Sequence, residues 1–423
     1  MKKYRFLFTI ALATILCTYF SLAQKLLIPM DFTQTDHLKA YGITFWILQK
    51  SQPVDWLLNY RGGSFMTDYS DVIATECRIR GVSFESIEGS QAATIYAEIQ
   101  NENVNMEVVR LEKAPKIAVY APPNIPPWDD AVRLALEYAE VPHEILWDEE
   151  VLSGKLDNYD WIHLHHEDFT GQYGKFYASY HNVPWYIQQV ALNESVAQKL
   201  GFSKVSEMKL AVVKKIQQYI ASGGFMFAMC SATDSYDIAL AADGVDICSE
   251  MYDGDPADPM ANRKLDFSKT LAFENFQLTQ DPYEYEFSNI DVGPLTGQAN
   301  ADMDYFTLFD FSAKYDPVPS MLTQCHVNII RGFLGQTTAF HKAMVKKSDI
   351  VLAERDGTDE VKYIHGNYGR GTFTWYGGHD PEDYRHAVGD PPTDLKLHKN
   401  SPGYRLILNN VLFPAAKKKK QKT

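Results

Sequence analysis

The stretch that most constrains the fold is Ser222–Ala242, which reads SGGFMFAMCSATDSYDIALAA. A Gly-Gly turn precedes the apolar run Phe225–Met229, and Cys230 separates this run from the apolar-periodic segment Ile238–Ala242. The pattern predicts a buried strand that passes straight into a helix, with Cys230 at the sharp turn, as in a nucleophile elbow. A thiol at a helix N-terminus is expected to favour the thiolate because of the helix dipole. The alternative interpretation is a buried cysteine that packs as a small apolar side chain.

The first 23 residues have the pattern of a secretory signal peptide. Lys2, Lys3 and Arg5 precede the apolar run 6–20, and Ser21-Leu22-Ala23 resembles a cleavage site. The apolar run is shorter than the roughly 20 residues that a membrane span needs, so we predict no transmembrane segment after signal removal. The expected product is an exported, periplasmic protein that begins near Gln24.

The charge of the chain excludes some classes of partner. The formal net charge is −14, and removal of Lys2, Lys3 and Arg5 takes it to −17. Such an acidic body should repel nucleic acid and anionic membranes. The run Lys417–Lys420 with Lys422 is interpreted as a solvated, disordered tail.

Four cysteines remain after signal removal, which is too few for a disulfide-dense scaffold. They are Cys77, Cys230, Cys248 and Cys325. If Cys230 is a working thiol, at least one of the other three must also be free.

The chain divides into regions of different pattern. Residues 24–114 predict a small α/β domain in which strands at Lys25–Met30 and Trp56–Tyr60 flank a helix at Asp36–Gln49. Residues 115–416 predict a larger domain interrupted by an insertion at about 243–336, and residues 417–423 form the basic tail.

Strands and helices alternate in the larger domain. Expected strands lie at Lys116–Ala121, His143–Trp147 and Asp160–His166, and helical spacing covers 129–139 and 205–219. Three late strands are expected, and they are Ile350–Ala353, Lys362–His365 and Thr372–Tyr376. The alternation predicts an α/β fold with a doubly wound, mainly parallel sheet.

Three of the expected strands end in residues that can carry chemistry. One ends at Cys230, another in His163–Asp168, and the last in His379–Asp383. Ligands of open α/β sheets bind beyond the carboxyl ends of the strands, so these groups are expected to converge at one edge. We therefore predict a catalytic set. In it, Cys230 attacks the substrate, His379 accepts and returns the thiol proton, and Glu382 or Asp380 orients the His379 imidazole. The alternative for His379 is an ordinary turn histidine.

The remaining candidate residues are assigned to substrate binding. They are His165, His166, Glu167, Asp168 and Ser231. A zinc site that includes some of these side chains and a distant ligand is an open alternative, since zinc accepts nitrogen, oxygen and sulfur donors. The spacing matches no recognised metal motif, and we therefore predict neither a metal nor a cofactor.

The order of elements around Cys230 resembles the class I glutamine amidotransferase-like fold over about 116–242 and 345–413. In that family the elbow cysteine is the nucleophile, and a His-x-Glu after the last strand completes a triad, which the resemblance places at Cys230 and His379. The sequence departs from the pattern of that family in two places. Ala228 and Ala232 stand where the family has the elbow glycines, and Pro381 stands where it has the glutamate.

The segments LLIPMD, YDWIHLHHEDFTGQYGKFY, FMFAMCSATDS and FTWYGGHDPEDY further resemble a group of exported bacterial proteins labelled asparagine synthetase B. The ATP loop and the N-terminal glutaminase cysteine that this label implies are absent from the sequence.

The sequence therefore supports two hypotheses of function. The first is an exported amidotransferase-like, Cys-dependent hydrolase that acts on an amide or related bond of a small-molecule or envelope-derived substrate. The second is a non-catalytic envelope protein that binds glycan or a protein partner. The sequence does not fix the oligomeric state.

Overall fold

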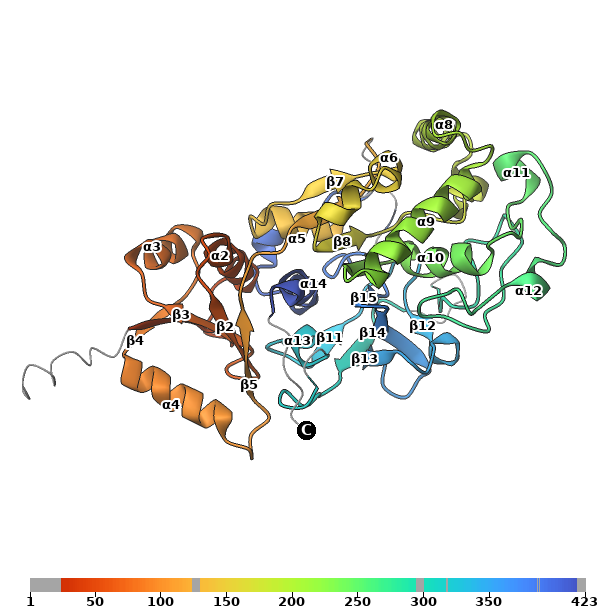
Figure 1. The fold of residues 1–423 in the computed structure, drawn as a ribbon. Coiled ribbons are helices and arrows are strands. Elements are labelled where there is room, and N and C mark those ends of the chain that lie inside the picture. Colours follow the sequence, from red (N-terminus) through yellow and green to blue (C-terminus); the bar gives the residue numbers. More distant parts are fainter. Residues whose placement is uncertain are drawn as a thin grey trace, which may run out of the picture.

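The computed structural model describes residues 24–123, 130–293, 300–316, 319–385, 387 and 389–416. The signal peptide and the lysine tail expected from the sequence lie outside these residues. Two β-sheets organise the described chain, and Ala114-Pro115, the expected boundary, lies between them (Figure 1).

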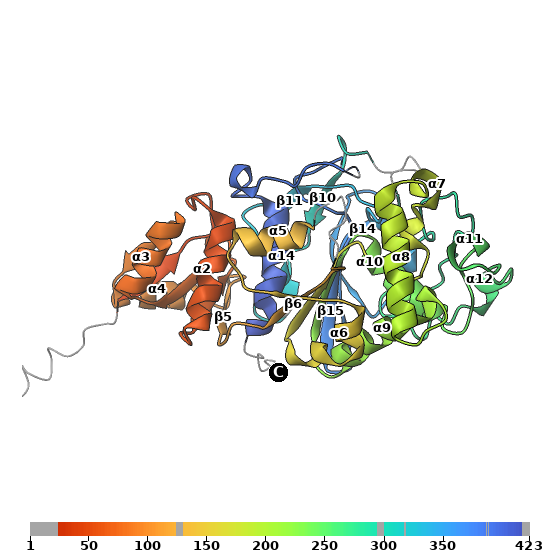
Figure 2. The ribbon, with the colours of Figure 1, turned by 90° about the horizontal axis from the view of Figure 1, so that it is seen from above.

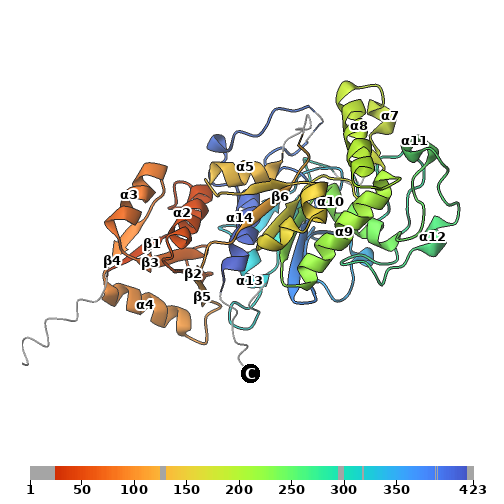
Figure 3. The ribbon, with the colours of Figure 1, turned by 45° about the horizontal axis from the view of Figure 1, so that its top comes forward.

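The first sheet is antiparallel throughout and has the strand order β4-β1-β3-β2-β5. Its strands are β1 (Lys25–Ile28), β2 (Val54–Leu58), β3 (Ser64–Asp68), β4 (Glu85–Ile87) and β5 (Glu107–Leu111). Helices α2 (His37–Gln49) and α3 (Asp71–Arg80) cover one face, and α4 (Gly89–Gln100) covers the other (Figures 1 and 3). Of these five strands the sequence predicted those near β1 and β2, and it did not predict β3, β4 and β5.

The second sheet has ten strands and the order β11-β10-β13-β14-β15-β9-β8-β6-β7, with β12 paired to β14. One half is parallel and contains β6 (Ile117–Tyr120), β7 (Glu144–Leu146), β8 (Trp161–Leu164), β9 (Phe225–Met229) and β15 (Gly371–Tyr376). The other half is antiparallel and contains β10 (Tyr305–Leu308), β11 (Ile329–Arg331), β12 (Phe340–His341), β13 (Ile350–Glu354) and β14 (Glu360–Tyr368). The α/β class is confirmed, but the sheet is mixed rather than mainly parallel, and a doubly wound parallel fold is not confirmed.

Short connections explain the antiparallel half. β14 and β15 are joined by a tight hairpin in which Tyr368 pairs with Gly371, and β13 and β14 are separated only by residues 355–359. Parallel neighbours need a crossover of a dozen or more residues, so strands this close in sequence pair antiparallel. β10 and β11 extend this half, which means that the expected insertion at 243–336 contributes strands to the sheet.

Helices cover both faces of the parallel half (Figure 2). Alternate residues of β6, β8 and β9 face α5 (Ala131–Tyr138) and α14 (Pro402–Leu412) on one side. The others face α6 (Asp148–Leu152), α9 (Val205–Ala221) and α10 (Ser231–Ala241). The strands are therefore buried on both faces, which accounts for the continuous apolar run of β9. The remaining helices are α7 (Tyr177–Tyr180), α8 (Pro184–Lys199), α11 (Glu250–Asp253), α12 (Ala261–Lys264) and α13 (Pro319–Leu322).

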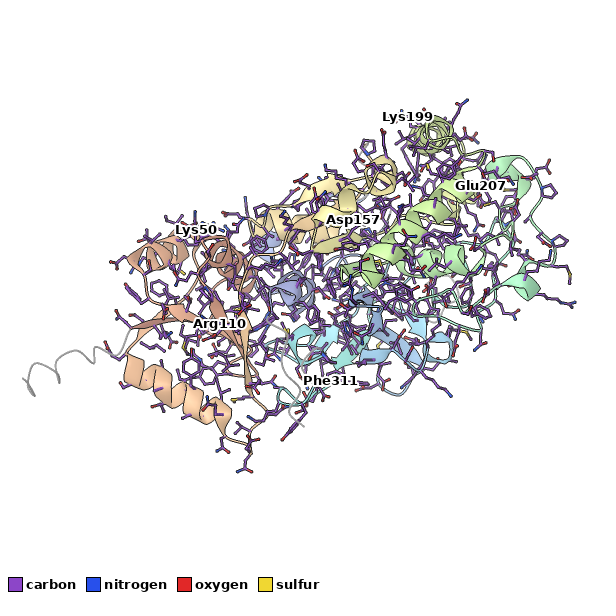
Figure 4. The ribbon with its side chains drawn as sticks, viewed as in Figure 1. Lys50, Arg110, Asp157, Lys199, Glu207 and Phe311 are labelled. Atoms are coloured by element: carbon purple, nitrogen blue, oxygen red, sulfur yellow. The ribbon has the colours of Figure 1, made fainter. Side chains whose placement is uncertain are left out.

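Helix α14 joins the two sheets into one core (Figure 1). Residues Gly403–Leu412 are all buried, and the Arg405 guanidinium donates hydrogen bonds to the backbone oxygens of Met30 and Gly62 in the N-terminal unit. Ala416 then pairs with Leu111 of β5. Charged side chains such as Lys50, Asp157 and Lys199 lie on the outside, as the labels of Figure 4 show.

No helix among the described residues combines the length and the apolar character that a membrane crossing requires.

Candidate active site

Three neighbouring parallel strands end at the candidate site. β9 lies between β8 and β15, so the residues that follow these strands come together at one edge of the sheet. His165 and His166 follow β8, Cys230 follows β9, and His379 follows β15 after Gly377-Gly378. The structure thus places these residues at one edge of the sheet, as expected from the sequence.

Cys230 occupies a strained turn. Its backbone has φ 50° and ψ −142°, a conformation that a residue with a Cβ rarely adopts and that costs about 1–3 kcal/mol. α10 begins at the next residue, and the Cys230 N–H donates to Tyr376 O of β15 at 3.3 Å. The strand–turn–helix arrangement predicted for the elbow is present, and strain of this kind is found where a reactive side chain must be held in place.

The environment of the thiol differs from the expectation of a ready thiolate. Burial raises the pKa of the Cys230 thiol to about 11, although the backbone N–H groups of Thr337, Ser231 and Gln336 oppose this shift. The side chain is 1% exposed. Desolvation therefore outweighs the helix dipole, and a nucleophilic Cys230 needs a base. All four cysteines of the described chain are free, as a working thiol requires.

Four imidazoles form what we call the histidine cluster, consisting of His163, His165, His166 and His379. His165 lies at its centre, with ring-centroid distances of 4.3 Å to His379, 5.0 Å to His166 and 5.4 Å to His163. The rings of His166 and His379 stack at 5.5 Å. The cluster bridges the ends of β8 and β15, which lie on either side of the Cys230 strand.

Asp130 is a member of the site that the sequence did not reveal as such. Its Oδ1 lies 3.5 Å from His163 Nε2 and 3.4 Å from His165 Nδ1, and it caps α5 by accepting from the N–H groups of Val132 and Arg133. Burial alone would raise the pKa of this carboxyl, but the neighbouring His163 and His165 hold the pKa well below its usual range. From the sequence, Asp130 was expected only to be an acidic residue in the first turn of the helix predicted at 129–139.

His163 has a fixed orientation as well. Its Nδ1 lies 3.1 Å from the carbonyl oxygen of Phe227 in β9, and its Nε2 lies 3.3 Å from His165 Nδ1. The Asp130 carboxylate, His163 and His165 therefore form a continuous polar chain inside the sheet edge.

Three of the predicted substrate-binding residues shape the loops of the site. The Glu167 carboxylate accepts from the His165 N–H at 3.0 Å, and burial together with the nearby Asp130 charge raises the pKa of Glu167 to about 8. Asp168 accepts from the N–H groups of Thr170 and Gly174 and so holds the loop after β8. The Ser231 hydroxyl donates to His166 O at 3.0 Å.

The two acids proposed to orient His379 make contacts with other groups. Asp380 accepts from the Glu382 N–H at 2.8 Å and from the Thr393 hydroxyl at 2.7 Å. Glu382 accepts from Tyr384 OH at 2.7 Å and lies 3.0 Å from His398 Nδ1. These contacts order the segment after His379, and Asp130 lies against two other imidazoles of the cluster, His163 and His165.

Two sets of side chains at this edge have the composition of metal ligands. The ligand atoms of His165, His166 and His379 all lie within 4.8 Å of one another, and so do those of Asp130, His163 and His165. A third set is Asp246, Cys248 and Asp253, and the Lys204 ammonium already pairs there with Asp246 at 2.6 Å and Asp253 at 3.0 Å.

Comparisons with known proteins place the chain in no established family. No family model and no curated protein match it. Solved structures that match include two proteins of Salmonella typhimurium described as cytoplasmic, STM3548 and STM1381 from strain LT2. Each is 12% identical, and the matches cover 72% and 71% of this chain and all of the other, with TM-scores of 0.35 and 0.36.

A GH42 β-galactosidase, Gan42B, also matches at 8% identity and a TM-score of 0.25, over 63% of this chain and 28% of that protein. The resemblance to an exported group labelled asparagine synthetase B and to the amidotransferase-like family is corrected, because no family model and no curated protein supports either name and the sheet is mixed.

Proposed function

We propose that this protein is a hydrolase in which the Cys230 thiol attacks an amide or related acyl bond. The observation that supports the proposal is the strained backbone of Cys230. This residue follows β9, and the two neighbouring strands, β8 and β15, bring His165 and His379 together at the same edge. Strain in a non-glycine residue persists only when the surrounding structure enforces it, and such residues gather at active sites.

The reaction has two halves. The Cys230 S–H gives its proton to an acceptor in the histidine cluster, the sulfur bonds to the acyl carbon, and the leaving amine or alcohol departs with a proton. Water then attacks the thioester, which releases the acid and restores the thiol. Asp130 supports the proton acceptor by fixing the orientation of His165 through Nδ1.

An activated acyl ester tests the nucleophile directly. With p-nitrophenyl acetate, the protein is expected to release a burst of p-nitrophenol and to carry an acetyl group on Cys230 in peptide mass spectra. Cys230→Ala should abolish both, whereas Cys325→Ala, which removes a half-buried cysteine next to Pro402 of α14, should change neither. An acetyl adduct that persists in Cys230→Ala would refute the proposal.

The raised pKa of Cys230 gives a separate pH prediction. Because burial raises the pKa of the thiol to about 11, the thiolate fraction grows about tenfold per pH unit below that value. Alkylation of Cys230 by iodoacetamide, followed by peptide mapping, should therefore accelerate steadily between about pH 7 and 9. A labelling rate that is already flat across this range would mean a preformed thiolate and would contradict the neutral resting thiol.

A further inference from the structure

We propose that His165, His166 and His379 bind one divalent transition-metal ion, with zinc as the best match, at the carboxyl edge of the parallel strands. The inference rests on the proposed function only in that it assigns a cofactor to the same edge of the sheet.

The spacing of the three imidazoles suits a shared ion. Their ligand atoms lie within 4.8 Å of one another. Nitrogen ligands at about 2.0–2.1 Å from a tetrahedral zinc ion are separated by about 3.3 Å, so small movements of the three rings bring all of them into coordination. Two ligands come from the end of β8 and the third from the loop after β15, so the ion would tie together strand ends that β9 separates.

The surroundings of His165 match those of a metal-bound histidine. Metal-binding imidazoles use their second nitrogen to contact a carboxylate or a carbonyl, which fixes the ring and increases its basicity. Asp130 Oδ1 lies 3.4 Å from His165 Nδ1, so we assign metal binding to the other ring nitrogen, Nε2. Asp130 is itself held by the N–H groups at the start of α5, so the carboxylate cannot turn away without uncapping that helix.

Burial favours the metal over three protonated rings. His165 is 0% exposed and His379 is 3% exposed, and the cluster packs a third and a fourth imidazole against them. Buried positive charges in contact would repel one another strongly, whereas neutral imidazole is the form that coordinates zinc. Nitrogen ligands also select zinc and related ions over magnesium and calcium, which prefer oxygen.

Three protein ligands leave a fourth position for water, as in catalytic zinc sites. A zinc ion held by His165, His166 and His379 would lower the pKa of bound water to about 7 and would thus supply a base for the Cys230 thiol. A neutral thiol in the resting protein is consistent with this role.

Metal titration of the full chain tests the inference. After dialysis against a chelator, the protein should bind one Zn²⁺ per chain by elemental analysis, and Co²⁺ should give the visible d–d absorption of a tetrahedral site. His166→Ala and His379→Ala should each weaken binding by at least about 100-fold, and Asp130→Asn by about 10- to 100-fold. Asp253→Asn, in the set occupied by Lys204, is the matched control and should leave metal binding unchanged.

The outcomes separate the metal site from the nucleophile. Circular dichroism of each variant establishes that it is folded. Two independent ligand variants are used so that the test still gives a result if one of them fails to fold. Stoichiometric binding that survives in both His166→Ala and His379→Ala, or no binding to the folded wild-type protein, overturns the metal site. If Cys230→Ala still binds Zn²⁺ but forms no acetyl adduct, both proposals stand, and if Cys230 is acetylated in a protein that binds no metal, only the hydrolase proposal stands.

Discussion

A Lys209→Met substitution is expected to lower the free energy of unfolding by about 3–5 kcal/mol, because it leaves the Asp148 carboxylate buried without its cation. Lys209 Nζ lies 2.8 and 3.0 Å from the two oxygens of Asp148, which are fully buried, and 3.1 Å from Tyr120 OH. It also lies 3.9 Å from the centre of the Trp147 ring. After the substitution the Tyr120 hydroxyl still donates to the carboxylate, but no cation among the described residues pairs with it.

Urea denaturation followed by circular dichroism measures this loss. The double variant Lys209→Met with Asp148→Leu removes both charges and should recover most of the stability, since an apolar pair of similar volume tolerates burial. Lys199→Ala is the surface control, because Lys199 pairs with Glu149 in an exposed position (Figure 4) and should cost about 0–1 kcal/mol. A Lys209→Met protein as stable as this control would show that the buried pair contributes little.

A Gly42→Ala substitution is expected to destabilise the protein by about 2–3 kcal/mol or more. Gly42 lies on α2 where that helix meets the end of α5, and a Cβ at this position would lie 1.8 Å from the carbonyl oxygen of Ala139. The obstructing atom belongs to the backbone, so the contact is relieved only if α2 and α5 move apart. These helices belong to the two different units, and the variant therefore weakens the packing between them.

Thermal and urea unfolding of Gly42→Ala give the size of the effect. Ser90→Ala, at an exposed position of α4, is the matched helical control and should change the stability by no more than about 0.5 kcal/mol. A melting temperature equal to that of Ser90→Ala would mean that the two helices separate without cost.

The sequence predicted the parts of the fold whose signals are local. The β9 strand, Cys230 and α10 could be predicted because a buried apolar run, a small-residue turn and a helix follow one another directly. The convergence of Cys230, His165, His166 and His379 followed from a general property of parallel strands, whose carboxyl ends share an edge. The antiparallel pairing of β13, β14 and β15 was missed, although the short connections at residues 355–359 and 369–370 allow only antiparallel neighbours.

The parts of the site that were missed depend on contacts between distant residues. Asp130 has the sequence signature of a helix cap, and its contact with His163 and His165 becomes visible only when β6, β8 and α5 are assembled. The pKa of Cys230 was predicted to fall because of the α10 dipole, but the surrounding core buries the sulfur and raises the pKa, and the backbone N–H groups of residues 336 and 337 oppose this shift only in part. Burial by distant segments leaves no pattern in one sequence.

The position of α14 means that the N-terminal unit cannot complete its core from its own residues. Residues Gly403–Leu412 fill the space between the two sheets, and Arg405 contacts the carbonyls of Met30 and Gly62, which lie far from it in the sequence. Until α14 docks, the apolar face of α2 that it covers is exposed. A partly folded chain with such a face is prone to aggregate and is the kind of species that chaperones bind.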